Sequence, residues 1–324
     1  MSPCPRSLAP GLQQRLLVHL QRWARPRHSH WDRLALLAVR AELAALLAPL
    51  GPLEEHRFGV GSQAGCNLIL RLPGRQSHRP PLLVGAHYDG PLHSPGADDN
   101  ATGLAALVEL AQHWARQPPR RPVWLVAFDQ EELGLLGSIA LAAQLRASGQ
   151  DLALMVSLEM LGYTSSQQRY PLAAMRHLYG ERGDFLALVA NLKALPLLPA
   201  LARRLGRHVP TKLLPVPQAG RLLPDVRRSD HSPFWDQGYA AVMATDTSFL
   251  RNPHYHQATD TIASLDLPFL TAVTTGLAEA LSALCTFGLL RCVPLISAAG
   301  APRRCQHSRW GFRGRRCRPP LALV

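Results

Sequence analysis

Acidic residues and histidines follow three of the short apolar runs in this 324-residue sequence. The residues concerned are His87, Asp89, Glu131, Glu132 and Glu159. A carboxylate at the end of a buried run is costly unless a cation pairs with it or a metal ion binds it. Imidazoles and carboxylates are both common metal ligands. These positions therefore predict a metal site, with one carboxylate available to move protons as a general base.

The first group is the tripeptide His87-Tyr88-Asp89, which ends the apolar run 81–86. Residues i and i+2 of a strand share a face, so the two polar side chains lie together. His87 can then bind a metal ion while Asp89 holds its ring from behind. The tripeptide alone is a weak signal, because a histidine at a strand end is often an ordinary surface or core residue.

A glycine-flanked turn comes next, with the sequence Gly-Ala-Asp-Asp-Asn-Ala-Thr-Gly over residues 96–103. Aspartate and asparagine are also frequent in loops that cap helices, which is the alternative explanation. Two adjacent acids after a histidine motif favour a metal site instead. One carboxylate of the pair can bridge two cations and offset their repulsion.

The adjacent Glu131 and Glu132 follow the apolar run 122–128. A divided role fits them, in which one glutamate binds metal and the other takes a proton from a water molecule. The alternative is the start of a helix, where acidic residues match the helix dipole. The pair by itself does not separate these two explanations.

Helical and extended patterns alternate along the chain and must position these residues. Residues 10–50 have helical spacing of leucines, and residues 55–72 carry extended signals. Residues 185–191 fit either a strand or the start of a helix. Further strands are predicted at 81–87, 122–128, 152–158, 212–216 and 240–245, and helices at 101–116, 133–147, 197–205 and 267–290.

This alternation predicts a single three-layer α/β domain. We expect a mostly parallel, mixed and twisted central sheet with helices on both faces. In such folds, ligands bind at the carboxyl ends of the strands, where the acidic residues and histidines lie.

Much of the net charge of +13 comes from the C-terminal end. Residues 291–324 contain eight arginines and no acid, which leaves +5 for residues 1–290. A basic end with glycine and proline is typical of a flexible tail. We predict a catalytic domain over 1–290, with a helical N-terminal part over 1–50, and a basic flexible tail over 291–324. No nucleic-acid-binding motif accompanies the charge, so nucleic acid is not an expected partner.

Targeting and cysteine signals are sparse. The six cysteines form no Cys-x-x-Cys pair, so no cysteine zinc site is predicted. No apolar run near the N-terminus resembles a signal sequence. The apolar stretch 278–290 is too short and too interrupted to span a bilayer. We expect a cytoplasmic protein without a membrane span.

Taken in order, the motifs resemble those of the zinc exopeptidase family. They are His-x-Asp at 87–89, Gly-Ala-Asp-Asp-Asn-Ala-Thr-Gly at 96–103, Glu-Glu-x-Gly-x-x-Gly-Ser at 131–138, Ser-Asp-His at 229–231 and His-x-x-x-Asp-Thr at 256–261. That family contains bacterial leucine-type aminopeptidases, glutamate carboxypeptidases and animal-type glutaminyl cyclases. The resemblance spans roughly residues 55–285 and implies the zinc-exopeptidase, phosphorylase/hydrolase-like architecture.

The resemblance implies a pair of Zn²⁺ ions. Their ligands would be His87, Asp99, Glu132, Glu159 and His256. Asp99 would bridge the two ions, and the Asp99–Asn100 peptide bond would be cis, as in relatives of this family. Many aminopeptidase relatives have aspartate where this chain has Glu159, a carboxylate on a longer arm.

Catalytic roles follow from the same resemblance. Glu131 would be the general base and Asp89 would orient the metal-binding histidine. Tyr255, directly before the last histidine, would donate a hydrogen bond to the oxyanion. His254 competes with His256 as a ligand, but the Thr-Asp-Thr stretch follows His256 at the family's spacing. Asp230 and His231 fit either the substrate pocket or a helix cap.

The resulting prediction is an aminopeptidase acting on peptides with a free N-terminus. A glutaminyl cyclase with one zinc ion is an alternative, as is a carboxypeptidase that uses Arg228 or Arg251 to bind the substrate carboxylate. A catalytically inactive binding module is disfavoured, because all ligand positions carry competent side chains. Phe234, Trp235 and Phe249 lie near the motifs, so we expect a partly apolar pocket.

Overall fold

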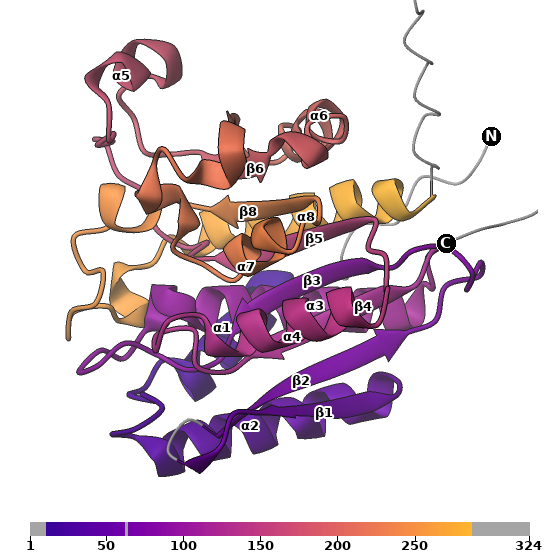
Figure 1. Ribbon diagram of the computed structural model, residues 1–324. Helices are drawn as coiled ribbons and strands as arrows, with labels where there is room; N and C mark the ends of the chain where they lie inside the picture. Colours follow the sequence, from indigo (N-terminus) through magenta and orange to yellow (C-terminus); the bar gives the residue numbers. More distant parts are fainter. Residues whose placement is uncertain (1–10, 62–63, 287–324) are drawn as a thin grey trace, which may run out of the picture. The chain divides into compact units, whose positions relative to one another are not determined.

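An eight-stranded sheet organises the part of the chain that the computed structural model describes, residues 11–61 and 64–286 (Figure 1). Its strands are β1 (Leu53–Phe58), β2 (Gly65–Leu72), β3 (Leu82–His87), β4 (Val123–Phe128), β5 (Leu154–Glu159), β6 (Leu186–Asn191), β7 (Thr211–Val216) and β8 (Ala241–Thr245). The helices are α1 (Leu12–Trp23), α2 (Arg33–Leu47), α3 (Gly103–Arg116), α4 (Leu136–Ala147), α5 (Ala173–Tyr179), α6 (Leu198–Leu205), α7 (His231–Asp236) and α8 (Leu267–Thr286). The predicted tail, 291–324, lies outside the described residues.

Short apolar runs form the centre of this sheet. The strand order is β1-β2-β4-β3-β5-β8-β6-β7. Strands β4, β3, β5 and β8 run parallel, whereas β2 and β6 are antiparallel to β4 and β8, respectively. Every residue of β3, β5 and β8 is buried, as expected for strands covered on both faces. The predicted mixed sheet is confirmed, and the carboxyl ends of its four central strands meet at one edge.

Alternate residues of each strand face two separate helix layers. On one face, Leu82 and Val84 belong to the core that α1, α2, α3, α6 and α8 cover. On the other face, Leu83 and Met155 pack with α4 and α7. Successive side chains of a strand point to opposite faces, so the strand runs supply both cores. The predicted three-layer α/β architecture is confirmed.

Two elements differ from, or go beyond, the sequence-based expectations. The ambiguous stretch 185–191 forms strand β6, which pairs with β8 on one side and β7 on the other. Helix α5 has no counterpart among the predictions, because none of its seven residues is buried and no apolar periodicity marks it. It stands apart from the sheet, at the upper left of Figure 1.

Helix α8 is the one described helix whose length and composition would allow it to cross a membrane. It has 20 residues and is mostly apolar. However, 61% of its most apolar stretch of 18 residues is buried inside the protein. Leu270, Val273 and Leu277 of this helix belong to the core. Burial therefore accounts for its apolar composition.

Leu16 of α1 and Leu34 of α2 form a matched pair for testing this packing. Leu16 is fully buried, whereas Leu34 is 86% exposed. We predict that Leu16→Ala lowers the free energy of unfolding by about 2–5 kcal/mol, because it leaves a cavity in the core. Leu34→Ala changes it by less than about 0.5 kcal/mol. Urea denaturation followed by circular dichroism measures both, and equal effects would contradict the buried position of α1.

Candidate metal centre

The central strands bring the candidate ligands to one edge of the sheet. His87 is the last residue of β3 and Glu159 is the last residue of β5. Glu131 and Glu132 lie in the loop that follows β4. Because β4, β3 and β5 are parallel neighbours, these strand ends lie side by side. Asp99 joins them from the turn before α3.

Three carboxylates converge on the imidazole of His87, which is fully buried. Its Nε2 atom lies 3.3 Å from Oδ1 of Asp99 and 3.6 Å from Oε2 of Glu159. Oε2 of Glu131 is 4.0 Å from the same nitrogen. Within the described residues, Nε2 makes no hydrogen bond of acceptable geometry, which leaves its lone pair available for a cation.

The second carboxylate oxygen of Asp99 faces a second histidine. Oδ2 of Asp99 lies 3.2 Å from Nε2 of His256. Oε2 of Glu132 is 3.4 Å from the same nitrogen. Asp99 therefore stands between two imidazoles and presents one oxygen to each. The competing His254 turns away, because its Nδ1 pairs with the Thr259 hydroxyl at 2.8 Å.

The donor atoms are close enough together to hold divalent cations. Ligand atoms of His87, Asp99 and Glu132 all lie within 4.8 Å of one another, as do those of His87, Glu131 and Glu159. Imidazole nitrogen and carboxylate oxygen together suit zinc. The buried Oε1 of Glu132 has no hydrogen-bond partner among the described residues. These residues fit a metal centre.

Asp89 holds the ligand set from behind. Nδ1 of His87 lies 3.4 Å from Oδ1 of Asp89 and 3.3 Å from the backbone carbonyl oxygen of the same residue. The two carboxylate oxygens of Asp89 also accept the backbone N–H groups of Glu131 and Glu132, each at 3.1 Å. The second set of contacts has no signal in the sequence, because it joins loops from two different strands.

The turn that carries Asp99 is fixed on two sides. The Asp99–Asn100 peptide bond is cis, as the family resemblance implies. The carboxylate of Asp260 accepts the backbone N–H groups of Asp98 and Asp99, at 2.9 and 3.1 Å. The side chain of Asn100 donates to the carbonyl oxygen of Leu158 in β5. These bonds hold the turn against the strand ends.

Electrostatics of the cluster show an excess of negative charge. Burial raises the pKa of Glu131 and Glu132 well above the usual range, and neighbouring carboxylates add to the rise. Burial also opposes ionisation of Asp99, but the facing imidazoles of His256 and His87 outweigh it and lower the pKa of this carboxyl. The carboxylates Glu131 and Glu159 raise the pKa of His87 despite its burial. Perturbation of this kind is characteristic of cation and catalytic sites.

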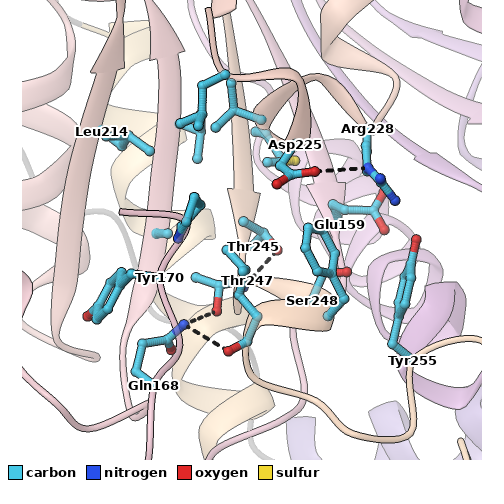
Figure 2. A pocket seen from close by; sticks show the side chains of 18 of the residues that line it. Glu159, Gln168, Tyr170, Leu214, Asp225, Arg228, Thr245, Thr247, Ser248 and Tyr255 are labelled. Carbon is cyan, nitrogen blue, oxygen red and sulfur yellow. Dashed lines mark hydrogen bonds and ion pairs between the residues drawn. The ribbon is translucent and has the colours of Figure 1, made fainter. Parts of the chain in front are cut away.

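An open pocket adjoins the cluster. Glu159 and Tyr255 lie on one side of it, and Tyr170 and Leu214 on the opposite side (Figure 2). Most of the lining away from the cluster is apolar or aromatic. This part comes from β6, β7, β8, residues 223–228, the 3-10 helix Ser248–Leu250 and the segment around α5. The segment around α5 was not expected to contribute, because no periodic pattern marked it.

Tyr255 lines this pocket next to the metal cluster. Its ring stacks on His256, with the ring centroids 3.8 Å apart. Burial and the facing carboxylates raise the pKa of its hydroxyl, so the group keeps its proton at neutral pH. A protonated phenol in this position can donate a hydrogen bond into the pocket.

Several expectations around α7 were wrong. Phe234 and Trp235 pack in the core and do not line the pocket, although Phe249 does. Asp230 and His231 are fully buried and do not line it either. Asp230 precedes α7 but makes no side-chain cap. Burial raises the pKa of Asp230 to about 7. Neither the pocket nor the cap explanation therefore describes Asp230.

The carboxylate–histidine cluster has the donor atoms of a metal centre, and the parallel strands place it at their carboxyl ends. Residues 67–281 match the model of peptidase family M28. This range is more than half of the chain, and the chain belongs to that family. The family is, by its description, one of peptidases.

Relatives with related sequences include known peptidases. The uncharacterized protein YfbL of Escherichia coli is 34% identical over 210 residues, which cover 61% of this chain and 65% of YfbL. Aminopeptidase YwaD of Bacillus subtilis is 38% identical over 78 residues, which cover 24% of this chain and 17% of YwaD. The chain thus spans less than two thirds of the length of either relative.

Solved structures share the fold at low sequence identity. LapA aminopeptidase of Legionella pneumophila superposes with a TM-score of 0.63 at 18% identity, covering 86% of this chain and 72% of LapA. A glutaminyl cyclase from an Acidobacteriales bacterium gives a TM-score of 0.66 at 16% identity, covering 88% of this chain and 97% of the cyclase. Both similarities concern the fold alone.

The histidines at 254 and 256 offer a matched test of the metal centre. We predict that His256→Ala weakens zinc binding at least about tenfold, the effect of losing even a supporting residue of a metal site. His254→Ala leaves the affinity unchanged, because its imidazole is bonded to Thr259. Competition with a chelating dye measures both constants. Equal losses in the two variants, or a loss only in His254→Ala, would contradict the assignment.

Proposed function

We propose that this protein is a metallo-aminopeptidase, which hydrolyses the N-terminal peptide bond of peptides with a free α-amine. One observation carries the proposal. Asp99 presents Oδ1 to His87 at 3.3 Å and Oδ2 to His256 at 3.2 Å. A carboxylate with one oxygen on each of two imidazoles suits a pair of cations that share it.

The residues that would hold two zinc ions fall into two sets that share Asp99. His87 and Glu159 would complete one set, and Glu132 and His256 the other. When bound, the ions polarise the scissile carbonyl and make water more acidic. The longer arm of Glu159 is held in place by the hydroxyl of Ser229, which donates to Oε2 at 2.7 Å.

Glu131 would be the general base. Its carboxylate borders both the ligand cluster and the pocket, and only 11% of its side chain is exposed. The contact between its backbone N–H and Asp89 fixes its loop. Glu131 would take a proton from the attacking water and return it to the leaving amine. Because this carboxylate borders both the ligand cluster and the pocket, it could take part in both proton transfers.

Tyr255 would stabilise the developing oxyanion. Its hydroxyl retains a proton, and its ring is held by stacking on His256. It would donate a hydrogen bond to the carbonyl oxygen of the substrate as negative charge grows there. Burial in a partly apolar pocket strengthens such a bond.

A glutaminyl-peptide cyclotransferase with one zinc ion is the alternative on the same fold. It would require only one side of Asp99, so the two-sided placement favours the aminopeptidase. A carboxypeptidase would require a cation for the substrate carboxylate. Arg251 is only 3% exposed and donates to Gln168 at 2.9 Å, so it is not available to bind a substrate carboxylate. Arg228 lines the pocket with 59% of its side chain exposed, and a carboxypeptidase would depend on it.

Substitution of the base tests the mechanism. We predict that Glu131→Gln keeps its zinc but lowers kcat by about 10²–10⁴-fold, because the amide cannot accept the proton. Glu181→Gln is the control, since that glutamate lies on the surface with 67% of its side chain exposed. Steady-state hydrolysis and elemental analysis measure the two effects. Near-full activity of Glu131→Gln would remove this residue from the role.

A panel of three substrates tests the reaction itself. We predict release of nitroaniline from leucine 4-nitroanilide, loss of release after chelation, and recovery with zinc. N-acetyl-leucine 4-nitroanilide should resist cleavage, because its α-amine is blocked. A peptide with N-terminal glutamine should lose that residue rather than cyclise. Formation of pyroglutamate with no nitroaniline release would instead identify the cyclotransferase.

A further inference from the structure

Arg27 is a buried cation with an unusual set of partners. It lies between α1 and α2 and is fully inaccessible to solvent. Within the described residues its guanidinium makes no ion pair and donates only to backbone carbonyl oxygens. The acceptors are those of Trp23, Arg25, Tyr88, Pro95, Gly96 and Asp99, at distances of 2.7–3.4 Å.

A buried charge without a carboxylate partner costs free energy, so we looked for a role that the Arg27 guanidinium fulfils. Burial lowers the pKa of Arg27, whereas the nearby charges of Asp99 and Asp89 act in the opposite direction. The guanidinium therefore sits in the field of the carboxylate cluster. It remains protonated because the pKa of arginine is so high.

Four acceptors of Arg27 belong to two of the segments that carry candidate metal ligands. Tyr88 directly follows His87, and its carbonyl oxygen accepts Nε of Arg27 at 3.1 Å. Pro95 and Gly96 open the turn that carries Asp99, and accept from the other two nitrogens at 2.7 and 2.9 Å. One planar side chain thus ties the end of β3 to this turn.

Two glycines make room for the guanidinium. The three heavy atoms nearest to a Cβ atom on Gly90 would all belong to Arg27, with Cγ at 3.1 Å, Cζ at 3.3 Å and Nη1 at 3.4 Å. A Cβ atom on Gly96 would lie 3.0 Å from Nη1 of Arg27 and 2.2 Å from the carbonyl oxygen of Asp99. The site is therefore shaped closely around this side chain.

The choice of carbonyl acceptors has a chemical consequence. An arginine paired directly with Asp99 would occupy the oxygens that face His87 and His256. Arg27 instead supplies positive charge and rigidity through the backbone, and leaves both oxygens free. The arrangement offsets repulsion among the ligands without competing for the metal ions.

We propose that Arg27 is a positioning residue for the metal centre, which sets the separation of His87 from Asp99 and thereby the affinity for zinc. This inference rests on the metal pair of the proposed function. It does not depend on which peptide bond is cleaved.

The test compares Arg27→Lys with Arg121→Lys in the full chain. Arg121 is also buried, at 2% exposure, and donates to the carbonyl oxygen of Pro80 at 2.9 Å. It lies beside the start of β4, at the opposite edge of the sheet from the ligands. Zinc affinity is measured by dye competition without substrate, and Tm is measured with and without saturating zinc.

We expect Arg27→Lys to weaken zinc binding about 10–100-fold, as observed for residues that support metal ligands. The rise in Tm on zinc addition should shrink accordingly, because that rise follows the affinity. Arg121→Lys should lower both Tm values equally and leave the zinc affinity unchanged. Unchanged zinc affinity in Arg27→Lys, whatever its Tm, would overturn the proposal.

Gly90→Ala is the second variant, for use if Arg27→Lys does not fold. The three heavy atoms nearest to the added methyl group would all belong to Arg27, so a weaker zinc affinity in the folded variant supports the proposal. An affinity equal to that of the unsubstituted protein overturns it. The unsubstituted chain separates the two hypotheses: failure to bind zinc at all would refute the proposed function, whereas equal binding by all variants would refute only the role of Arg27.

Discussion

Repulsion among buried carboxylates is the constraint on which the rest of this structure depends. At one edge of the sheet, each of four carboxylates lies within 4.0 Å of at least one of two imidazoles. The carboxylates are those of Asp99, Glu131, Glu132 and Glu159. Charges at this density in a poorly hydrated place require positive partners. The surrounding protein supplies them in part through N–H groups and one guanidinium, and we propose that zinc supplies the rest.

The supports of the cluster come from distant parts of the chain. The parallel strands β4, β3 and β5 provide an edge where three loops meet. Asp89 and Asp260 receive backbone N–H groups from the ligand-bearing loops. Arg27 reaches the same loops from the N-terminal helical region. The positions of the candidate metal ligands therefore depend on contacts between distant parts of the chain, and not on the motifs alone.

The sequence predicted which residues at the ends of strands belong to the site, but it did not predict the contacts between the segments that follow these strands. His87 and Glu159 could be predicted as site residues because each directly follows an apolar run, which is a local signal. Arg27 could not, since one arginine in a basic helical stretch carries no sign of burial. The pocket wall around α5 was missed because that helix buries none of its residues. Asp230 fitted two local explanations, and tertiary burial excluded both.

Anomalous diffraction at the zinc edge, from crystals grown with zinc, would locate bound metal ions at this site. We predict two strong peaks, one on either side of Asp99. One should lie among His87, Asp99 and Glu159, and the other among Asp99, Glu132 and His256. A single peak on one side of Asp99, or peaks bound elsewhere, would contradict a metal pair shared by this carboxylate.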